Sequence, residues 1–231
     1  MKTIGLLGGM SWESTLVYYR LINQTVKARL GGSHSARCLL YSVDFAEIET
    51  LQHASQWDEL THLMVAAVHR LEGGGADCLV ICTNTMHRMA REIQSATPLP
   101  LLHIADATAA AITAQGMNTI GLLGTRFTME GEFYRGKLER EHGMSVLTPD
   151  ERGRETVHRV IYDELIHGVI REESRRAYLA VIADLADKGA QGVILGCTEI
   201  SLLVQQKDLD LPVFDTTALH AQAAVEWALQ A

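Results

Sequence analysis

Short runs of consecutive apolar residues, bounded by glycine, alternate along this chain with longer segments in which apolar residues recur every three or four positions. A run without polar alternation predicts a strand that is buried on both faces, as in a parallel sheet covered by helices. The runs that predict strands are residues 4–7, 38–43, 78–81 and 101–104 in the first half, and 120–123, 193–195 and 213–214 in the second half.

The longer segments predict amphipathic helices. They cover residues 14–29, 57–72, 85–94, 130–142, 155–167 and 174–188. Residues 73–75, which are all glycine, and Gly189 end two of these helices just ahead of a predicted strand, as a C-terminal cap with positive φ requires. Strands and helices in alternation indicate an α/β protein of the doubly wound kind.

Several stretches of the first half return in the second half in the same order. Residues 3–8 read Thr-Ile-Gly-Leu-Leu-Gly, and residues 119–124 repeat them. Residues 75–83 align with residues 189–197, and 99–100 with 211–212, at nearly the same offset. We infer that a half of about 110 residues was duplicated. The duplication predicts two pseudo-symmetric, doubly wound domains, each a mainly four-stranded parallel sheet flanked by helices: residues 1–100 with 211–231, and residues 101–210.

In open α/β sheets, ligands bind beyond the carboxyl ends of the strands. Two domains related by an approximate two-fold axis can direct these ends at each other, so we expect the active site in an inter-domain cleft. The residues to examine are therefore those that follow each strand.

Composition and charge limit the classes of function. The chain is 47% hydrophobic with only 4 prolines, which is typical of a folded domain. Its net charge of −8 disfavours nucleic acid and anionic membranes as partners. No apolar run is long enough to span a bilayer, and residues 1–9 lack the features of a signal peptide, so we expect a cytoplasmic protein. We expect a homodimer as its assembly.

Three loops after predicted strands carry candidate chemistry. The first contains Gly8, Gly9, Met10 and Ser11, which match neither the dinucleotide-binding spacing of glycines nor a phosphate-binding loop. It is either an ordinary tight turn or a loop that binds a carboxylate through backbone N–H groups at a helix start.

The second loop reads Cys82-Thr83-Asn84-Thr85-Met86-His87, and the third reads Gly196-Cys197-Thr198-Glu199. Cys197 follows a strand among hydroxyl and carboxylate neighbours, which favours a catalytic thiol over a packing residue. Cys38 and Cys78 lie within predicted strands and are expected to pack in the core. Cys78, Cys82 and His87 match no zinc spacing, so we expect no metal.

These three loops resemble the signatures of the aspartate/glutamate racemase superfamily that works without pyridoxal phosphate, specifically its aspartate-racemase branch. The resemblance rests on Gly8-Gly9-Met10, on residues 83–87 and on residues 196–199, and it extends over essentially the whole chain. It implies a two-domain isomerase without a cofactor, in which one cysteine removes the substrate's α-proton and a second returns a proton from the opposite face.

The chain departs from this resemblance at the first cysteine. The family usually reads Cys-Asn-Thr where this chain has Thr83-Asn84-Thr85, and Cys82 stands one place early. Because adjacent residues of a strand point to opposite faces, we expect Thr83 to occupy the second position and Cys82 to remain only a possible participant. The resemblance implies aspartate as the substrate, but residues 46–49 and 164–167 lack the Arg and Lys that aspartate racemases of the family tend to carry for the distal carboxylate. The expected substrate is therefore not confined to aspartate: it is aspartate, glutamate or a related polar amino acid.

Inversion of an α-carbon needs a base and an acid on opposite faces. An ordinary thiol has a pKa near 8.5, which a helix start or a nearby cation can lower, so Cys197 is the expected base. The hydroxyl of Thr83 stays protonated at neutral pH, so Thr83 could deliver a proton but would abstract one poorly. We therefore expect the two enantiomers to be handled asymmetrically.

The neighbours of this pair have expected supporting roles. Glu199 either pairs with the substrate ammonium or caps its own helix, and His87 either orients a neighbour or is a buried histidine. The donors expected to bind the α-carboxylate are the backbone of Met10 and Ser11 with Asn84, Thr85 and Thr198.

Two other functions fit the same residues. A single catalytic cysteine is also compatible with a decarboxylase or a cis-trans isomerase of the same superfamily. A protein that has lost catalysis and retained amino-acid binding is the alternative outside the enzymes.

Overall fold

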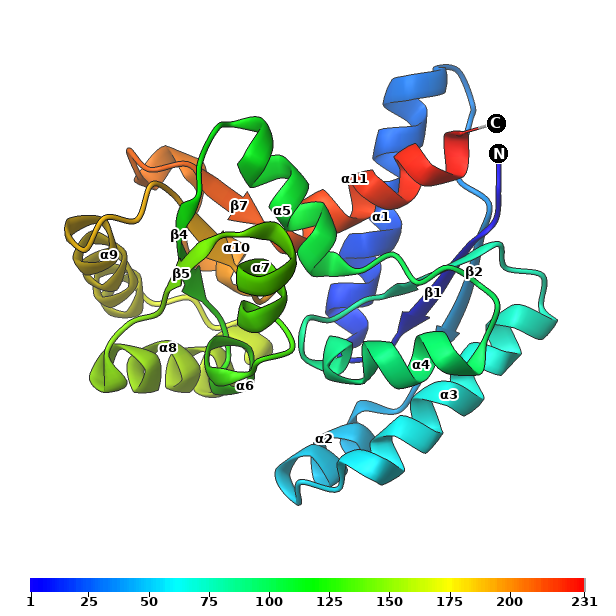
Figure 1. The fold of residues 1–231 in the computed structure, drawn as a ribbon, viewed down its shortest axis with the longest axis horizontal. Coiled ribbons are helices and arrows are strands. Elements are labelled where there is room, and N and C mark those ends of the chain that lie inside the picture. The colour runs from blue at the N-terminus through cyan, green and yellow to red at the C-terminus, as the bar shows by residue number, and fades with distance from the viewer. Residues whose placement is uncertain (231) are drawn as a thin grey trace. The chain divides into compact units, whose positions relative to one another are not determined.

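The computed structural model describes residues 1–230, and the chain forms two compact units. The first unit contains Met1–Ile104 and the segment from His220 onward, and the second contains Ala105–Leu219. The chain therefore passes from one unit to the other twice, after Ile104 and after Leu219 (Figure 1).

The first unit contains a parallel sheet with the strand order β2-β1-β3. Its strands are β1 (Ile4–Gly8), β2 (Cys38–Ser42) and β3 (Cys78–Ile81). The expected fourth strand at 101–104 is reduced to one isolated bridge between Leu79 and Leu101. The ladder ends after the hydrogen bond from the Leu102 N–H to the Leu79 carbonyl, because the chain turns into a helix at Ile104.

Alternate residues of this sheet enter two different apolar layers, as a two-residue period requires. Ile4, Leu6 and Val80 pack with helices α1 (Trp12–Leu30) and α11 (Thr216–Leu229). Leu7 and Ile81 pack with the helices of the opposite face (Figure 1). Those are α2 (Phe45–His53), α3 (Trp57–Gly73), the short 3-10 helix η1 (Thr85–Met89) and α4 (Ala90–Ala96).

The glycine turn between β1 and α1 is a close approach of two backbone segments. Gly9 has a φ of +91°, and a Cβ built there would lie 2.2 Å from the Val43 carbonyl oxygen. A residue without a side chain is therefore required. Ser11 then caps α1 by accepting a hydrogen bond from the Ser14 N–H.

The second unit repeats this arrangement with one additional strand. Its parallel sheet has the order β5-β4-β6-β7. The strands are β4 (Thr119–Leu123), β5 (Ser145–Leu147), β6 (Val193–Leu195) and β7 (Val213–Asp215). The two sheets together confirm the α/β fold class with parallel sheets flanked by helices, although only the second has four strands.

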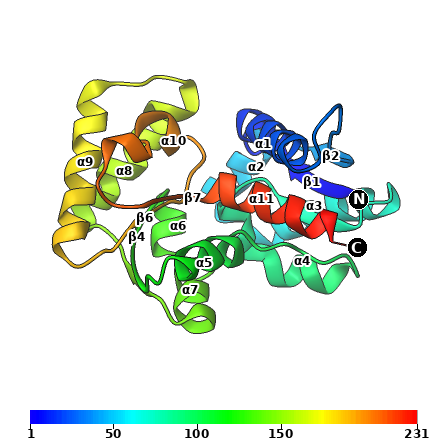
Figure 2. The ribbon, with the colours of Figure 1, turned by 90° about the horizontal axis from the view of Figure 1, so that it is seen from above.

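Helices cover both faces of the second sheet (Figure 2). Leu123, Val193 and Leu195 pack on the layer of α8 and α9, while α5 and α7 lie on the other side. The helical segments of this unit are α5 (Ile104–Ala114), α6 (Arg126–Glu130), α7 (Arg135–His142), α8 (Glu151–Asp163), η2 (Leu165–His167), α9 (Glu172–Asp187), α10 (Ile200–Leu203) and η3 (Gln206–Asp208).

Some predicted helices differ from the observed ones. Residues 85–94 begin as η1 before α4, and the segment predicted at 130–142 contains the end of α6, a break and then α7. Helices α5 and α11 were not predicted, because both are rich in alanine and their apolar residues do not form one stripe. Within residues 1–230, no helix is both long and apolar enough to cross a membrane.

Candidate functional site

Thr83 and Cys197 occupy the same place in two equivalent sheets. Thr83 lies two residues after β3, and Cys197 lies two residues after β6. Each of these strands pairs in parallel with the first strand of its own unit, Leu7 opposite Ile81 and Leu123 opposite Leu195. Both residues are partly exposed at the carboxyl end of a parallel sheet, where α/β proteins bind their ligands.

Cys82 has a different environment from Thr83. It continues the alternation of Cys78 and Val80 into the apolar layer of α1 and α11, and its side chain is 0% exposed. Burial raises the pKa of the Cys82 thiol far above its usual range. A thiol in this position is a packing group that does not ionise.

The two cysteines within strands are also poor nucleophiles. Burial raises the pKa of the Cys38 thiol to about 11 and that of the Cys78 thiol to about 12. Among residues 1–230, no three His, Cys, Asp or Glu side chains come together to form a metal site.

Cys197 contacts an acidic side chain. Its Sγ donates a hydrogen bond to Oε2 of Glu199 over 2.9 Å. Burial and then the negative charge of Glu199 raise the pKa of the Cys197 thiol well above its ordinary value. The expected lowering by a helix start is therefore wrong: the Thr198 and Glu199 N–H groups act in that direction, but their effect is smaller.

Glu199 does not cap its helix through its side chain. It is the N-cap residue of α10, a helix of only four residues, and makes no side-chain capping hydrogen bond. Of the two roles considered from sequence, the capping role is excluded by this geometry. The carboxylate is instead directed to the Cys197 thiol.

The loop that carries Cys197 is attached to the start of α11. The hydroxyls of Thr198 and Thr217 lie 3.2 Å apart, and the Thr216 hydroxyl donates to the Leu195 carbonyl over 2.9 Å. Asp215 caps α11 by accepting from the N–H groups of Thr217 and Ala218. This Thr-Thr pair after β7 was not identified from sequence, because a link between two loops leaves no local pattern.

The loop that carries Thr83 is held by His87. Nδ1 of His87 lies 2.9 Å from the Thr83 carbonyl oxygen, and Nε2 accepts from the Ile104 N–H over 3.3 Å. Asn84 and Thr85 are buried at the start of η1, 5% and 8% exposed. His87 therefore orients a neighbour and is buried at the same time.

The residues of the glycine loop have structural tasks. Met10 is buried in the apolar layer of α2 and α3, and the Ser11 side chain caps α1. Thr15 was missed by the sequence analysis: its Oγ1 accepts from the Gly9 N–H and donates to the Ser11 carbonyl. These bonds fix the turn at the carboxyl end of β1.

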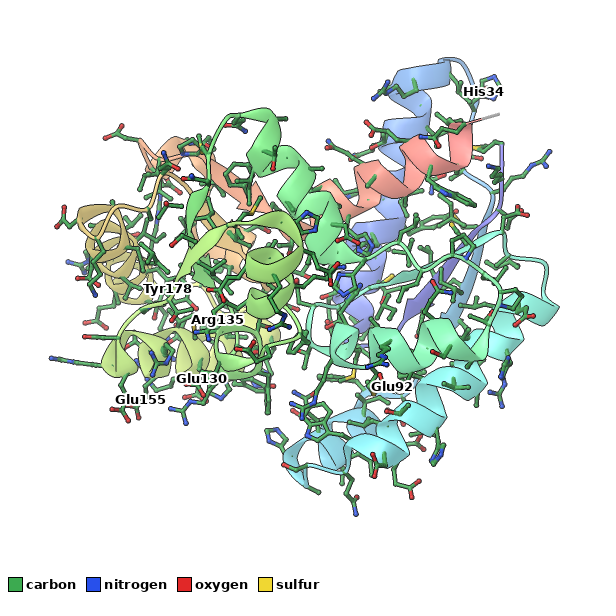
Figure 3. The ribbon with its side chains drawn as sticks, in the orientation of Figure 1. His34, Glu92, Glu130, Arg135, Glu155 and Tyr178 are labelled. Carbon is green, nitrogen blue, oxygen red and sulfur yellow. The ribbon has the colours of Figure 1, made fainter. Side chains whose placement is uncertain are left out.

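An acidic residue begins the segment 164–167, which lacks the lysine that the resemblance implies before Gly168. Glu164 is 3% exposed, accepts a hydrogen bond of 2.6 Å from Ser174, and lies 3.9 Å from Arg171. Tyr178 of α9, labelled in Figure 3, donates to the Val157 carbonyl, and burial followed by the charges of Cys197 and Glu164 raises its pKa. Cys197 and Glu164 thus both contribute to the electrostatic surroundings of Tyr178, which no sequence motif revealed.

Residues 7–224 match the family described as Asp/Glu/Hydantoin racemase, and the chain belongs to this family. This is a racemase family, of the isomerase class, and the α/β fold with parallel sheets flanked by helices agrees with it.

Individual relatives agree with this assignment. The chain is 58% identical to a crystal structure described as a "putative Asp/Glu Racemase" from Yersinia pestis, with 100% of both chains covered and a TM-score of 0.95. It is 31% identical to PH1733, an aspartate racemase homologue from Pyrococcus horikoshii OT3, with 100% of both chains covered and a TM-score of 0.88. It is also 22% identical over 234 residues to the broad specificity amino-acid racemase RacX of Bacillus subtilis, which covers 96% of each chain.

Proposed function

We propose that the protein is an amino-acid racemase that works without a cofactor, in which Cys197 removes the α-proton and Thr83 supplies a proton to the opposite face. The observation that carries the proposal is the equivalence of the two residues: each stands two positions beyond the strand that pairs with the first strand of its unit. A duplicated fold with one reactive group in each copy supplies the base and the acid that inversion needs.

Glu199 completes the base in this proposal. In the resting pair the proton is on sulfur, because burial and the carboxylate both disfavour a thiolate. The ammonium of a bound amino acid adds a positive charge that favours the thiolate, and the thiol proton passes along the 2.9 Å hydrogen bond to Glu199. The thiolate then takes the α-proton of the substrate.

Thr83 completes the inversion. Its hydroxyl gives a proton to the carbanion, and water returns a proton to the alkoxide that remains. Glu199 releases the proton it accepted to water, so solvent loses one proton and regains one. Since an unassisted hydroxyl is a poor base, the enantiomer whose α-hydrogen faces Cys197 is the one that exchanges this hydrogen readily.

We propose aspartate, glutamate or a related polar amino acid as the substrate. Support comes from the relatives, among them an aspartate racemase homologue and a broad specificity amino-acid racemase. The segment 164–167 contains the buried carboxylate of Glu164 and no lysine, which argues against a lysine of this segment as the group that binds a distal carboxylate. A panel of amino acids identifies which of them is the substrate.

The test is a panel of L- and D-amino acids incubated with purified protein in heavy water, with α-deuteration scored by mass and the enantiomers separated. We expect α-deuteration and inversion for at least one acidic or polar amino acid without added cofactor. Amino acids that raise the melting temperature but gain no deuterium would indicate a binding protein instead. Release of carbon dioxide from a malonate derivative would indicate the one-cysteine alternative.

A further inference from the structure

His87 is the centre of a buried group that the proposed reaction does not use. Its Nδ1 faces the carbonyl oxygen of Thr83 at 2.9 Å, and its Nε2 faces the N–H of Ile104 at 3.3 Å. A carbonyl oxygen can only accept and an amide N–H can only donate a hydrogen bond. The ring is therefore neutral, with its proton on Nδ1, and it donates to the loop of Thr83.

Neighbouring rings hold this orientation. The rings of His103 and His220 meet that of His87 edge to face, with centroids 4.6 Å and 5.6 Å away. His220 is itself fixed, since its Nε2 donates to the Leu102 carbonyl over 2.7 Å and its Nδ1 accepts from the Tyr18 hydroxyl over 2.9 Å. Burial, followed by His103 and His220, lowers the pKa of His87 well below its ordinary value, so the ring stays neutral.

The backbone on the other side of Thr83 is also fixed. The N–H of Cys82 donates to the carbonyl of Leu7 on β1 over 2.9 Å, which continues the sheet by one residue. The peptide that follows Thr83 has left the sheet, and its carbonyl is the one that His87 binds. The sheet thus holds the N–H of Cys82, and His87 holds the carbonyl of the next residue, Thr83.

We propose that His87 is a positioning residue for the proton donor: by holding the Thr83 carbonyl, it fixes the backbone from which the Thr83 hydroxyl reaches the substrate. This inference rests on the proposed function, because it assigns to Thr83 the return of the proton. A donor misplaced by about 1 Å can cost on the order of 100-fold in rate. A carbanion that waits for this donor is recaptured by the Cys197 thiol on the face from which the proton left.

The consequence is a change in how the carbanion partitions. Recapture by Cys197 regenerates the starting enantiomer, and it carries deuterium when the thiol has exchanged with heavy water. Delivery by Thr83 gives the opposite enantiomer. The ratio of deuterium in the recovered starting enantiomer to product formed therefore reports the position of the donor, whereas general loss of folded protein lowers both quantities equally.

Two variants of similar size separate the two hydrogen bonds of the ring. The amide nitrogen of His87→Asn lies close to the position of Nδ1 and retains a donor for the Thr83 carbonyl. The longer amide side chain of His87→Gln reaches the position of Nε2. It retains an acceptor for the Ile104 N–H and loses the hydrogen bond to the Thr83 carbonyl. We expect His87→Gln to raise the exchange-to-inversion ratio by about tenfold or more, and His87→Asn to stay within about threefold of the wild type.

Equal ratios in the wild type and both variants would overturn the positioning role, even if both variants were less active and melted at lower temperature. A larger ratio for His87→Asn than for His87→Gln would also contradict it. Wild-type protein that deuterates no amino acid refutes the racemase proposal and the positioning role together. An active wild type with unchanged ratios refutes the positioning role alone.

Discussion

The thiol of Cys197 donates its proton to the carboxylate of Glu199 across 2.9 Å. Since the carboxylate and burial both raise the pKa of the thiol, the same contact that offers an acceptor for its proton also keeps the free enzyme in the thiol form. A thiol protected in this way resists alkylation and oxidation until a substrate arrives.

Glu199→Gln should separate thiol ionisation from catalysis. Removing the negative charge lowers the pKa of Cys197 toward its ordinary value, so alkylation by iodoacetamide at pH 8 should become faster. Removing the proton acceptor should nevertheless lower kcat/KM for α-deuteration by about 100-fold or more. If both alkylation and deuteration became faster, Glu199 would only raise the pKa of the Cys197 thiol and would not accept its proton during catalysis.

Cys197→Ala and Cys82→Ala should have opposite effects on activity and stability. Without the Cys197 thiol, neither inversion nor α-deuteration should be detectable, while folding should be little changed at this partly exposed position. Cys82→Ala removes a buried sulfur from the layer of α1 and α11, which should cost about 1 kcal/mol of unfolding free energy and leave most of the turnover. Chemical denaturation and the heavy-water assay measure the two effects, and the reverse pattern would move the base to Cys82.

Thr83→Val retains the shape of the side chain and removes the hydroxyl. We expect inversion to fall by about 100-fold or more, while the enantiomer that faces Cys197 continues to gain deuterium. Thr83→Ser, which restores the hydroxyl, should recover inversion. Because enantiomers have equal free energy in water, the forward and reverse kcat/KM must remain equal in each variant. The asymmetry therefore appears in kcat and KM taken separately, or in exchange. Equal inversion by the Val and Ser variants would exclude Thr83 as the proton donor.

The free energy of unfolding should fall in mild acid because of His87. Its pKa in the folded state lies well below the 6.5 of the free side chain, so below pH 6.5 the unfolded chain binds a proton that the folded chain does not. The free energy of unfolding is then lost as pH falls, by up to 1.36 kcal/mol per pH unit for one proton, down to the folded-state pKa. The titratable groups that face His87 are His103 and His220, and Tyr18 faces His220 in turn. These three residues stay unchanged when the wild type is compared with a His87 variant.

The variant His87→Asn isolates this contribution. Between pH 7 and pH 5, its unfolding free energy measured by urea denaturation should fall less steeply than that of the wild type. Parallel slopes for the two proteins would show that His87 is protonated in the folded state as readily as in the unfolded chain.

Gly9→Ala should destabilise the first unit far more than Gly31→Ala. Both glycines have positive φ, +91° and +73°, so both substitutions carry a backbone cost of about 1 kcal/mol. At Gly31 nothing lies within 4 Å of an added Cβ, whereas at Gly9 the Val43 backbone oxygen and nitrogen lie 2.2 Å and 2.5 Å away. We expect a further loss of about 2 kcal/mol or more at Gly9, as for an overpacked site. Equal melting temperatures would show that the turn can move away from Val43.

The sequence determined most of the strands, the duplication and the candidate pair, but it did not indicate β5. Uninterrupted apolar runs such as those around Leu6, Val80 and Ile194 have few alternatives to a strand buried on both faces, and these predictions were confirmed. The aligned repeats also assigned Thr83 and Cys197 to equivalent positions. Residues at the same distance from the ends of equivalent strands occupy equivalent places in the two sheets.

Only the tertiary structure decided what surrounds those two residues. The strand expected at 101–104 became a single bridge because a helix starts at Ile104. Segments α5 and α11 form helices although their apolar residues show no single stripe, since alanine itself favours a helix. The Glu199 carboxylate on the Cys197 thiol and the His87 ring on the Thr83 carbonyl depend on loop conformation and burial. Hydrogen-bond partners and pKa values depend on which groups lie close together in space. The sequence determines these contacts only through the complete tertiary structure.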